Sequence, residues 1–464
     1  MRRSLLLLTV AASLFALPLI AQNTDIESLA GLQFNFGNPG ARSLGMGGAF
    51  IALADDASAA EANPAGLTIL RKPEFTIEGR NYEEQQILTT SGTFPDLQRT
   101  AFSHYSDRVD PTFASVVYPL GRFTIVGYYH QPLRNRGSGL VVPQTDPFTG
   151  QTTANVPDFY LPRDGTGPVS AQRCSQIVQQ ANDPFACLQY TTIPFISTLN
   201  VEERTFGFGG AWKIGTLSLG ATARYQTFHE NALTLRLGDG LQTLSQVVQQ
   251  TGTIDANGKI ANKNEHDVTF AAGVKWAPTE SFSVGGVYKK GPRFNAPTFA
   301  ATFGTNFQYV KLADTTFHIP DVIGAGVSFR PIPVLTLNVD AVRVKYSNLV
   351  DDFVSVNSSV RQVAHPYKAN DATEIHAGGE YFFSTRIPFA IRAGYWRDPV
   401  HSVEYAGPLN TSERIAAAIL YPKGTAQNHR SIGAGLAWPR FQIDAAYDTS
   451  ERYKVGSISM VARF

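Results

Sequence analysis

The chain has 464 residues, and its 39 basic and 38 acidic side chains nearly cancel. This balance argues against a nucleic-acid partner, which needs a basic surface. At this length the chain could hold several soluble domains, so the order of elements along it has to decide the fold class.

The N-terminus predicts export. Arg2 and Arg3 precede an apolar run from Leu5 to Ile20, which is the composition of a secretory signal peptide. The run is short of the ~20 apolar residues that a membrane-spanning helix needs, and no Cys directly follows it to carry a lipid anchor. Residues 1–21 are therefore predicted to be a signal peptide, with Ala21 before the cut.

A segment rich in small residues follows, "GMGGAFIALADDASAAEANPAGL" from Gly45 to Leu67. It is too short and too polar to span a membrane, and it has no metal-binding or nucleotide-binding spacing. Pro64 fixes its own φ and biases Asn63 away from the helical region, so a short helix is expected to end at this point.

From about residue 73 onward, apolar and polar residues alternate, which is the period of strands with two different faces. In "FQIDAAYD", Phe441, Ile443 and Tyr447 share one face, whereas Asp444 and Asp448 share the other. About fourteen strands are predicted, near 73–82, 110–119, 122–131, 197–213, 215–236, 265–277, 281–296, 315–329, 334–350, 370–384, 388–398, 428–438, 440–449 and 454–464.

Three features favour an all-β, transmembrane antiparallel barrel over a soluble sandwich. The connections alternate between short and long, and aromatic residues recur at the ends of the apolar faces, as in membrane barrels with aromatic girdles. The chain also ends in "SISMVARF", and a last strand ending in Phe464 resembles the assembly signal read by the barrel assembly machinery. Because every backbone group in lipid must be paired, such a sheet has to close on itself.

Within the predicted strand 334–350, "VRVKYS" breaks the alternation and puts Arg343 and Lys345 on the face that was apolar. Either the strand passes beyond the bilayer or a bulge resets it.

The two cysteines, Cys174 and Cys187, lie in one polar segment between the third and fourth predicted strands. In an exported protein they are expected to form a disulfide. Closing so short a loop would contribute on the order of 3 kcal/mol by chain entropy.

The stretch "GARSLGMGGAFIALADDASAAEANPAGL", residues 40–67, resembles the N-terminal segment of the FadL-type outer-membrane transporters of long-chain fatty acids and other hydrophobic compounds. The similar PorV/PorQ-type barrels share it. The resemblance implies an outer-membrane barrel of residues 73–464 plugged by a small hatch of residues 22–72. The hatch motif falls on Asn63, Pro64 and Ala65, and outer-membrane lipid and lipopolysaccharide become expected partners.

If residues 22–72 plug the barrel, we expect close packing and paired charges between them and the inner wall. Asp55 and Asp56 are expected to pair with lumen bases such as Arg224 or Arg392. Small lumen positions are expected to receive the plug, at Gly207, Gly209, Gly324, Gly326, Gly433 and Gly435.

No constellation of residues points to an enzyme, a cofactor or a metal site, and we expect none. The predicted function is passive uptake of a hydrophobic, carboxylate-bearing ligand such as a long-chain fatty acid, gated by the hatch. Its candidate contacts are Met46, Phe50, Ile51, Arg224, Arg392 and Phe382. The alternative is a PorV-like platform for secreted proteins, or a structural barrel.

Overall fold

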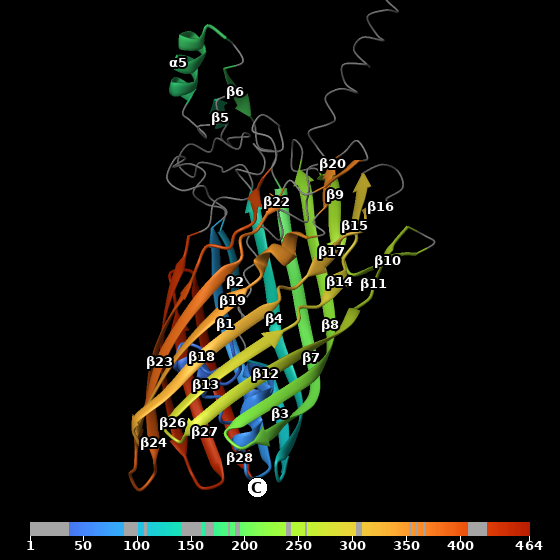
Figure 1. Cartoon of the computed structure of the whole chain (residues 1–464). Coiled ribbons are helices and arrows are strands. Elements are labelled where there is room, and N and C mark those ends of the chain that lie inside the picture. The colour runs from blue at the N-terminus through green and yellow to red at the C-terminus, as the bar shows by residue number, and fades with distance from the viewer. Residues whose placement is uncertain are drawn as a thin grey trace, which may run out of the picture.

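In the computed structural model the chain forms one closed antiparallel β-barrel (Figure 1). Each strand pairs with its neighbours in chain order, and β1 closes the ring by pairing with β28 over Glu74–Arg463 through Glu84–Tyr453. The structure describes residues 37–87, 101–105, 109–141, 159–162, 171–183, 186–190, 195–237, 243–255, 258–302, 309–351, 354–357, 361–364, 367–406 and 425–464.

The predicted barrel of fourteen strands is confirmed. Its strands are, in order round the wall, β1 (Glu74–Ile87), β3 (Asp110–Leu120), β4 (Phe123–Val141), β7 (Phe195–Ile214), β8 (Leu217–Leu237), β12 (Glu265–Thr279), β13 (Phe282–Lys289), β18 (Val322–Ile332), β19 (Leu335–Val344), β23 (Ala372–Phe383), β24 (Phe389–Asp398), β26 (Gln427–Ala437), β27 (Phe441–Thr449) and β28 (Tyr453–Arg463).

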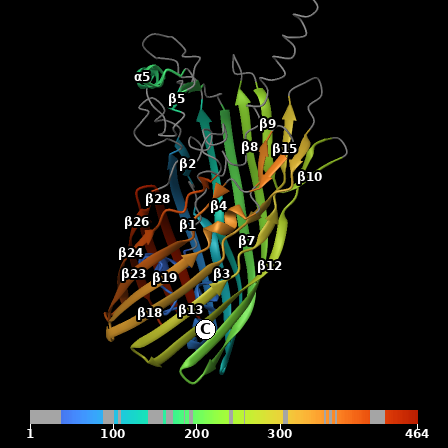
Figure 2. The ribbon, with the colours of Figure 1, turned by 45° about the horizontal axis from the view of Figure 1, so that its top comes forward.

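The two ends of the barrel differ. At one end short turns join the strands, and at the other, which we call the outer end, β4, β7 and β8 reach far beyond their neighbours (Figure 2). Four strands extend the sheet at the outer end: β2 (Ala101–Tyr105), β9 (Thr243–Gln250), β15 (Thr298–Thr302) and β16 (Val310–Ala313). Five two-stranded pairs lie there too: β5 (Phe159–Pro162) with β6 (Cys187–Tyr190), β10 (Gly252–Ile254) with β11 (Ile260–Asn262), β14 (Arg293–Asn295) with β17 (Thr316–His318), β20 (Val354–Asn357) with β21 (Arg361–Ala364), and β22 (Tyr367–Lys368) with β25 (Glu404–Tyr405).

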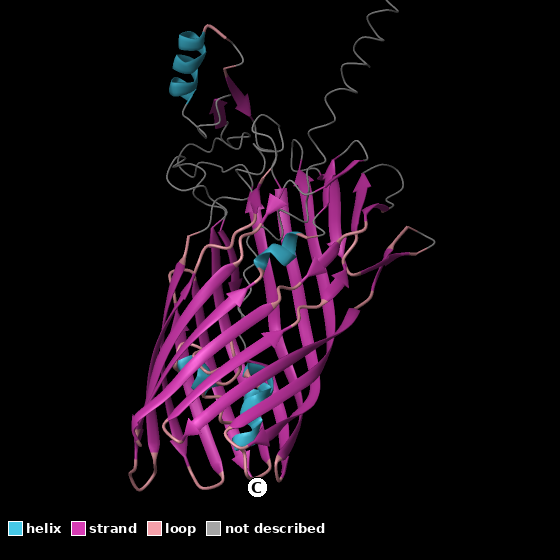
Figure 3. Ribbon diagram, viewed as in Figure 1, coloured by secondary structure: helices cyan, strands magenta, loops and turns pink. Residues whose placement is uncertain are grey.

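Helices are few and short (Figure 3). Among the described residues they are α3 (Ala41–Gly45), α4 (Ala59–Ala62), the 3₁₀ helices η1 (Pro64–Ile69) and η4 (Tyr346–Val350), and α5 (Ala171–Ala181). In the part of the chain that the structure describes, no helix is long and apolar enough to cross a lipid bilayer.

The outward faces of the strands are apolar. Along β18 buried and exposed residues alternate, so Ile323, Val327 and Phe329 are exposed while Ser328 is buried. Aromatic side chains are exposed beside the short turns, at Phe123, Trp212, Trp276, Phe329, Trp438 and Phe441. An apolar belt bordered by aromatic residues matches a wall that faces lipid.

Three predicted strands were too long, and proline accounts for two of them. β13 ends at Lys289 before Pro292, and β18 starts at Val322 after Pro320, because proline has no N–H to give to a ladder. β19 ends at Val344 and η4 follows it. The ladder to β18 runs without a shift from Leu337 to Val344, so no bulge resets this strand before it ends, and Arg343 is exposed near the outer end.

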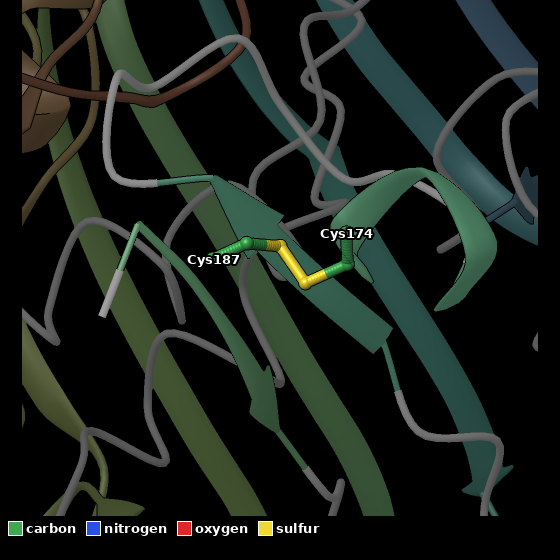
Figure 4. The surroundings of a disulfide bond; sticks show 2 residues. All are labelled: Cys174 and Cys187. Atoms are coloured by element: carbon green, nitrogen blue, oxygen red, sulfur yellow. A yellow bond between two sulfur atoms is a disulfide. The ribbon is translucent and has the colours of Figure 1, made fainter. Parts of the chain in front are cut away.

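Cys174 on α5 and Cys187 on β6 form a disulfide, with 5.4 Å between their Cα atoms (Figure 4). Both side chains are buried. The bond ties α5 to the β5–β6 pair, in the connection between β4 and β7.

Phe464 offers a test of the assembly signal. Its side chain is 73% exposed, while its backbone N–H donates to the carbonyl of Pro73 at 3.0 Å. Replacing Phe464 with Ala keeps this backbone bond, so we expect the finished barrel to lose no more than about 0.5 kcal/mol. Assembly by the barrel machinery should nevertheless slow, measured as the rate at which the heat-modifiable folded band appears. Assembly at the wild-type rate would contradict the assembly signal.

Candidate functional site

The lumen near the short turns holds the N-terminal part of the described chain, residues 37–72, which we call the inner segment (Figures 1 and 3). It contains α3, α4 and η1 and then runs into β1. Nearly all of its residues from 39 to 67 are buried. The predicted hatch begins at residue 22 and the signal peptide at residue 1, so both predicted boundaries lie outside the described residues.

Glycines of the wall allow the inner segment to approach the strands backbone to backbone. A Cβ on Gly378 would lie 2.1 Å from the carbonyl oxygen of Met46, and one on Gly394 would lie 2.1 Å from the amide nitrogen of Gly47. Other wall glycines that a Cβ would bring into the inner segment are Gly220, Gly273, Gly285 and Gly324. No side chain larger than hydrogen fits at these positions without a shift.

The predicted set of lumen glycines was only partly right. Gly324 and Gly433 face the inner segment, and a Cβ on Gly326 would lie 3.4 Å from Ala52 N. A Cβ on Gly207, Gly209 or Gly435 would instead meet wall residues. Alternation along a strand shows which glycines face the lumen, but it does not show which of them lie at the height of the inner segment along the barrel axis.

Polar wall side chains satisfy the backbone of the inner segment. One oxygen of Asp340 accepts from the amides of Phe50 and Ile51, at 2.6 and 2.8 Å. Asn63 donates to the carbonyls of Ile51 and Val274 at 2.9 and 3.2 Å, and its side-chain oxygen accepts from Ala65 N at 3.2 Å. The Asn63-Pro64 junction is therefore an anchored cap on η1.

Glu61 on α4 is the charged centre of the site. Tyr128 donates to it at 2.8 Å, Arg224 lies at 3.2 Å, and Lys289 lies at 3.4 Å. Nδ1 of His130 lies 3.8 Å from a carboxylate oxygen of Glu61. Burial alone would raise the pKa of Glu61, but the charges of Arg224 and Lys289 lower it to about 2. The strands β4, β8 and β13 therefore hold the inner segment through one ionised carboxylate.

Arg42 on α3 is a second charged centre. It binds Glu380 through two nitrogens at 2.9 Å each, and it also pairs with Asp55. Glu380 in turn accepts from Arg392 at 2.7 Å, and Arg392 lies 2.8 Å from Asp444. A chain of alternating charges thus runs from the inner segment into β23, β24 and β27.

The expected partners of Asp55 and Asp56 were wrong. Asp55 pairs with Arg42 and with Arg330, the latter at 3.2 Å, and Asp56 accepts from Ser58. Arg224 and Arg392 are bound to other carboxylates. The fold brings Arg42 beside Asp55 inside the inner segment, which no spacing along the sequence could show.

The lumen toward the outer end holds a cluster of buried apolar side chains, which we call the apolar cluster. Its members are Leu133, Leu199, Val201, Phe228, Ala232, Phe294, Ala296, Phe317, Ile319, Val322, Val344, Tyr346, Val350, Tyr367, Ala369 and Ala372. Phe228 stacks on Phe294 and Phe317, with ring centroids 4.6 and 4.8 Å apart. Phe228 and Arg224 share the inward face of β8, so the apolar cluster begins close to the Glu61 site.

The predicted ligand contacts fall into three places. Met46, Phe50 and Ile51 are buried in the inner segment against the wall. Arg224 and Arg392 belong to the two charged centres described above, where each faces a carboxylate. Phe382 lies at the short-turn end of β23, two residues beyond Glu380, and its side chain is 37% exposed. The apolar cluster escaped the prediction because its members come from stretches that are far apart in the sequence, between Leu133 and Ala372.

The pairing of the wall is interrupted beside β4. The ladder from β3 to β4 ends at Phe113–His130, and the ladder from β2 to β4 resumes at His104–Gly137. Between them, over 131–136, β4 has no pairing on this side within the described residues. The ladder from β4 to β7 also shifts register directly after His130.

Comparison with known proteins identifies the fold. No family model and no curated protein matches the chain. A FadL homologue from Pseudomonas aeruginosa superposes with a TM-score of 0.60 at 15% identity, over 93% of this chain and 100% of that one. The fold is FadL-type. The Pseudomonas putida toluene transporter TodX gives 0.58 at 14% identity, and the monoaromatic hydrocarbon channel CymD gives 0.53 at 16%. Each covers 93% of this chain and 99% of its own.

The FadL-type fold agrees with the resemblance of residues 40–67 and with the predicted strand order. TodX is a transporter and CymD a channel by their titles. At these identities the likeness extends to the fold.

The close approach of wall and inner segment can be tested at Gly378. Gly378→Ala places a methyl group against the Met46 carbonyl, so we expect a loss of about 1–3 kcal/mol in unfolding free energy and faster proteolysis of the inner segment. Gly456→Ala is the control, because nothing lies within 4 Å of its Cβ position. Equal behaviour of the two variants would contradict the packing.

Glu61→Gln should leave Arg224 and Lys289 buried without a counter-charge and cost about 3–5 kcal/mol in denaturant unfolding. Glu280→Gln, at an exposed turn, serves as the control. The folded pKa of Glu61 lies near 2, below its ordinary 4.5. Its stabilising charge is therefore complete above pH 4.5 and lost as the pH falls toward 2. The difference between wild type and Glu61→Gln should shrink over that interval, and a pH-independent difference would refute the assignment.

Proposed function

We propose that this protein is an outer-membrane channel for the passive uptake of hydrophobic molecules such as long-chain fatty acids. The observation that supports this most is the apolar cluster inside a barrel whose other lumen residues are largely polar. Burial of apolar ligand surface there gains roughly 25 cal/mol per Å², so collecting a ligand from water needs no energy source. The FadL-type fold supports the same function.

The ligand would enter at the outer end and settle against the apolar cluster. A carboxylate on the ligand would lie toward Arg224 and Lys289, since these two bases share the single carboxylate of Glu61. Met46, Phe50 and Ile51 are the other proposed contacts, on the inner segment. No covalent chemistry is proposed.

Ligand identity is best tested by lipid mass spectrometry on the purified protein. We expect a co-purifying fatty acid or hydrocarbon, depleted in a Phe228→Asp variant that puts a charge into the apolar cluster. The control variant is Glu280→Gln, which lies in an exposed turn outside the lumen and should retain the ligand. Ligand that is retained fully by Phe228→Asp would count against the apolar cluster as the site.

Gating by the inner segment predicts that a crosslink near its N-terminal end, far from β1 in sequence, blocks uptake. Ala41 N donates to Ser459 Oγ at 3.2 Å, so Ala41→Cys with Ser459→Cys should form a disulfide there. The control is Thr68→Cys with Ser218→Cys, whose hydroxyls lie 2.7 Å apart at the end next to β1. We expect the first crosslink to stop uptake until it is reduced, and the second to leave uptake unchanged. Unchanged uptake with the first crosslink verified would mean that the inner segment is a fixed plug.

A further inference from the structure

The short-turn end of the barrel carries bases that have no acidic partner. Six exposed bases lie there, which we call the basic rim: Arg71, Lys72, Arg122, Lys213, Arg386 and Arg440. Within the described residues none of them has an ion pair or a side-chain hydrogen bond. The short turns expose a single described acid, Glu280.

The basic rim follows one continuous arc of the wall. Arg386 and Arg440 lie in the β23–β24 and β26–β27 turns, Arg71 precedes β1, Arg122 lies in the β3–β4 turn, and Lys213 lies near the end of β7. These strands are consecutive in the ring, through the β28–β1 seam. In the remaining arc, the base at the β18–β19 turn is Arg330, which is bound to Asp55.

Three of the rim bases, Arg122, Lys213 and Arg440, are next in sequence to exposed aromatic residues. Phe123 stacks on Trp212 with centroids 5.6 Å apart, next to Arg122 and Lys213. Exposed Trp438 and Phe441 flank Arg440. Aromatic rings at this level mark the membrane interface, and long basic side chains next to them can reach the head groups.

The outer end is different, because many of its bases are neutralised by carboxylates. Lys290 lies 3.1 Å from Asp321, Arg343 lies 3.5 Å from Asp371, and Lys454 lies 3.0 Å from Glu83. Lys259, Arg397 and Arg430 also have no ion pair within the described residues and lie outside the rim, but the described short turns expose only one acid beside their bases, Glu280.

We propose that the basic rim binds the anionic head groups of phospholipids, such as phosphatidylglycerol, in the leaflet at the short-turn end. The bases are spread along the circumference beside the apolar belt, which suits head groups in a ring around the barrel better than one acidic protein docked on a patch. The proposal rests on the membrane location given in the proposed function. It would fix the depth and orientation of the barrel in an asymmetric bilayer.

The test compares retained lipids in the full mature chain. Protein from nanodiscs of equal phosphatidylethanolamine and phosphatidylglycerol is released into mild detergent, and native mass spectrometry counts each bound lipid. The variant Arg122→Gln/Lys213→Gln/Arg440→Gln is compared with Lys259→Gln/Arg397→Gln/Arg430→Gln, three exposed bases outside the rim. Both variants lose three charges, and the heat-modifiable band checks that each is folded.

We expect wild type and control to prefer phosphatidylglycerol over phosphatidylethanolamine. At low ionic strength the preference of the rim variant should be lower by a factor of about five for each base removed. The wild-type preference should also fall as salt is raised to 0.5 M, because screening shortens the reach of the charges. Equal retention of both lipids by wild type, or an equal loss in the control variant, would overturn the proposal. Polyglutamate binding that depends on the rim, without any lipid preference, would overturn it in favour of an acidic protein partner. Lipid retention needs no transport, so a failure of uptake leaves this result unaffected.

Discussion

Closure of the sheet between β1 and β28 is the constraint on which the rest of the structure depends. A sheet in lipid cannot leave an edge unpaired, and here the two strands that close it come from opposite ends of the barrel sequence. The inner segment reinforces this seam. Glu74 on β1 accepts from Ala57 N at 2.7 Å and binds Arg463 on β28 at 2.9 Å. Ala41 N donates to Ser459 on β28. The segment that precedes β1 therefore joins the first and last strands from inside.

A closed wall with an apolar outside has its polar side chains directed inward, and their charges must be compensated there. The inner segment supplies part of this compensation, with Glu61 for Arg224 and Lys289, and Arg42 for Glu380. Removing one partner from a buried ion pair costs about 3–5 kcal/mol of folding stability. Displacing the whole inner segment would leave several charges without their partners at once. A Gly- and Ala-rich composition leaves few long side chains to interlock with the wall, but the charged residues Arg42, Asp55 and Glu61 bind the inner segment to it. Arg42 holds the N-terminal part of the inner segment and Glu61 holds its C-terminal part, so any movement that accompanies transport has to break one of these two charged centres.

The sequence could predict the barrel because its signals are local. Each signal lies within a few residues: the alternation along a strand, a short turn, or Phe464 at the last strand. The predicted ends of two strands were wrong because Pro292 and Pro320 were not taken as breaks. The site depends on contacts between distant segments. Glu61 lies alone among alanines in "AAEANPAG" and meets Arg224 and Lys289 from two other strands, which alternation cannot reveal. Arg224 and Arg392 were chosen as inward bases and do lie inward, but the carboxylates beside them were missed.

The lumen contains two chemical environments in series, and this order bears on the route of a hydrophobic molecule. On the inward face of β8, Phe228 belongs to the apolar cluster, whereas Arg224 belongs to the charged half that the inner segment occupies. A molecule that continued straight toward the short turns would have to pass this buried charge. Beside β4, Leu133 of the apolar cluster lies within 131–136, where the described residues show no pairing with β2 or β3. On the other face of β4 at this level lie Arg134, which pairs with Asp110, and the exposed Arg136. A sideways exit there would replace the buried Glu61 centre by these more exposed charges, so both routes lead a hydrophobic molecule from the apolar cluster past charged side chains.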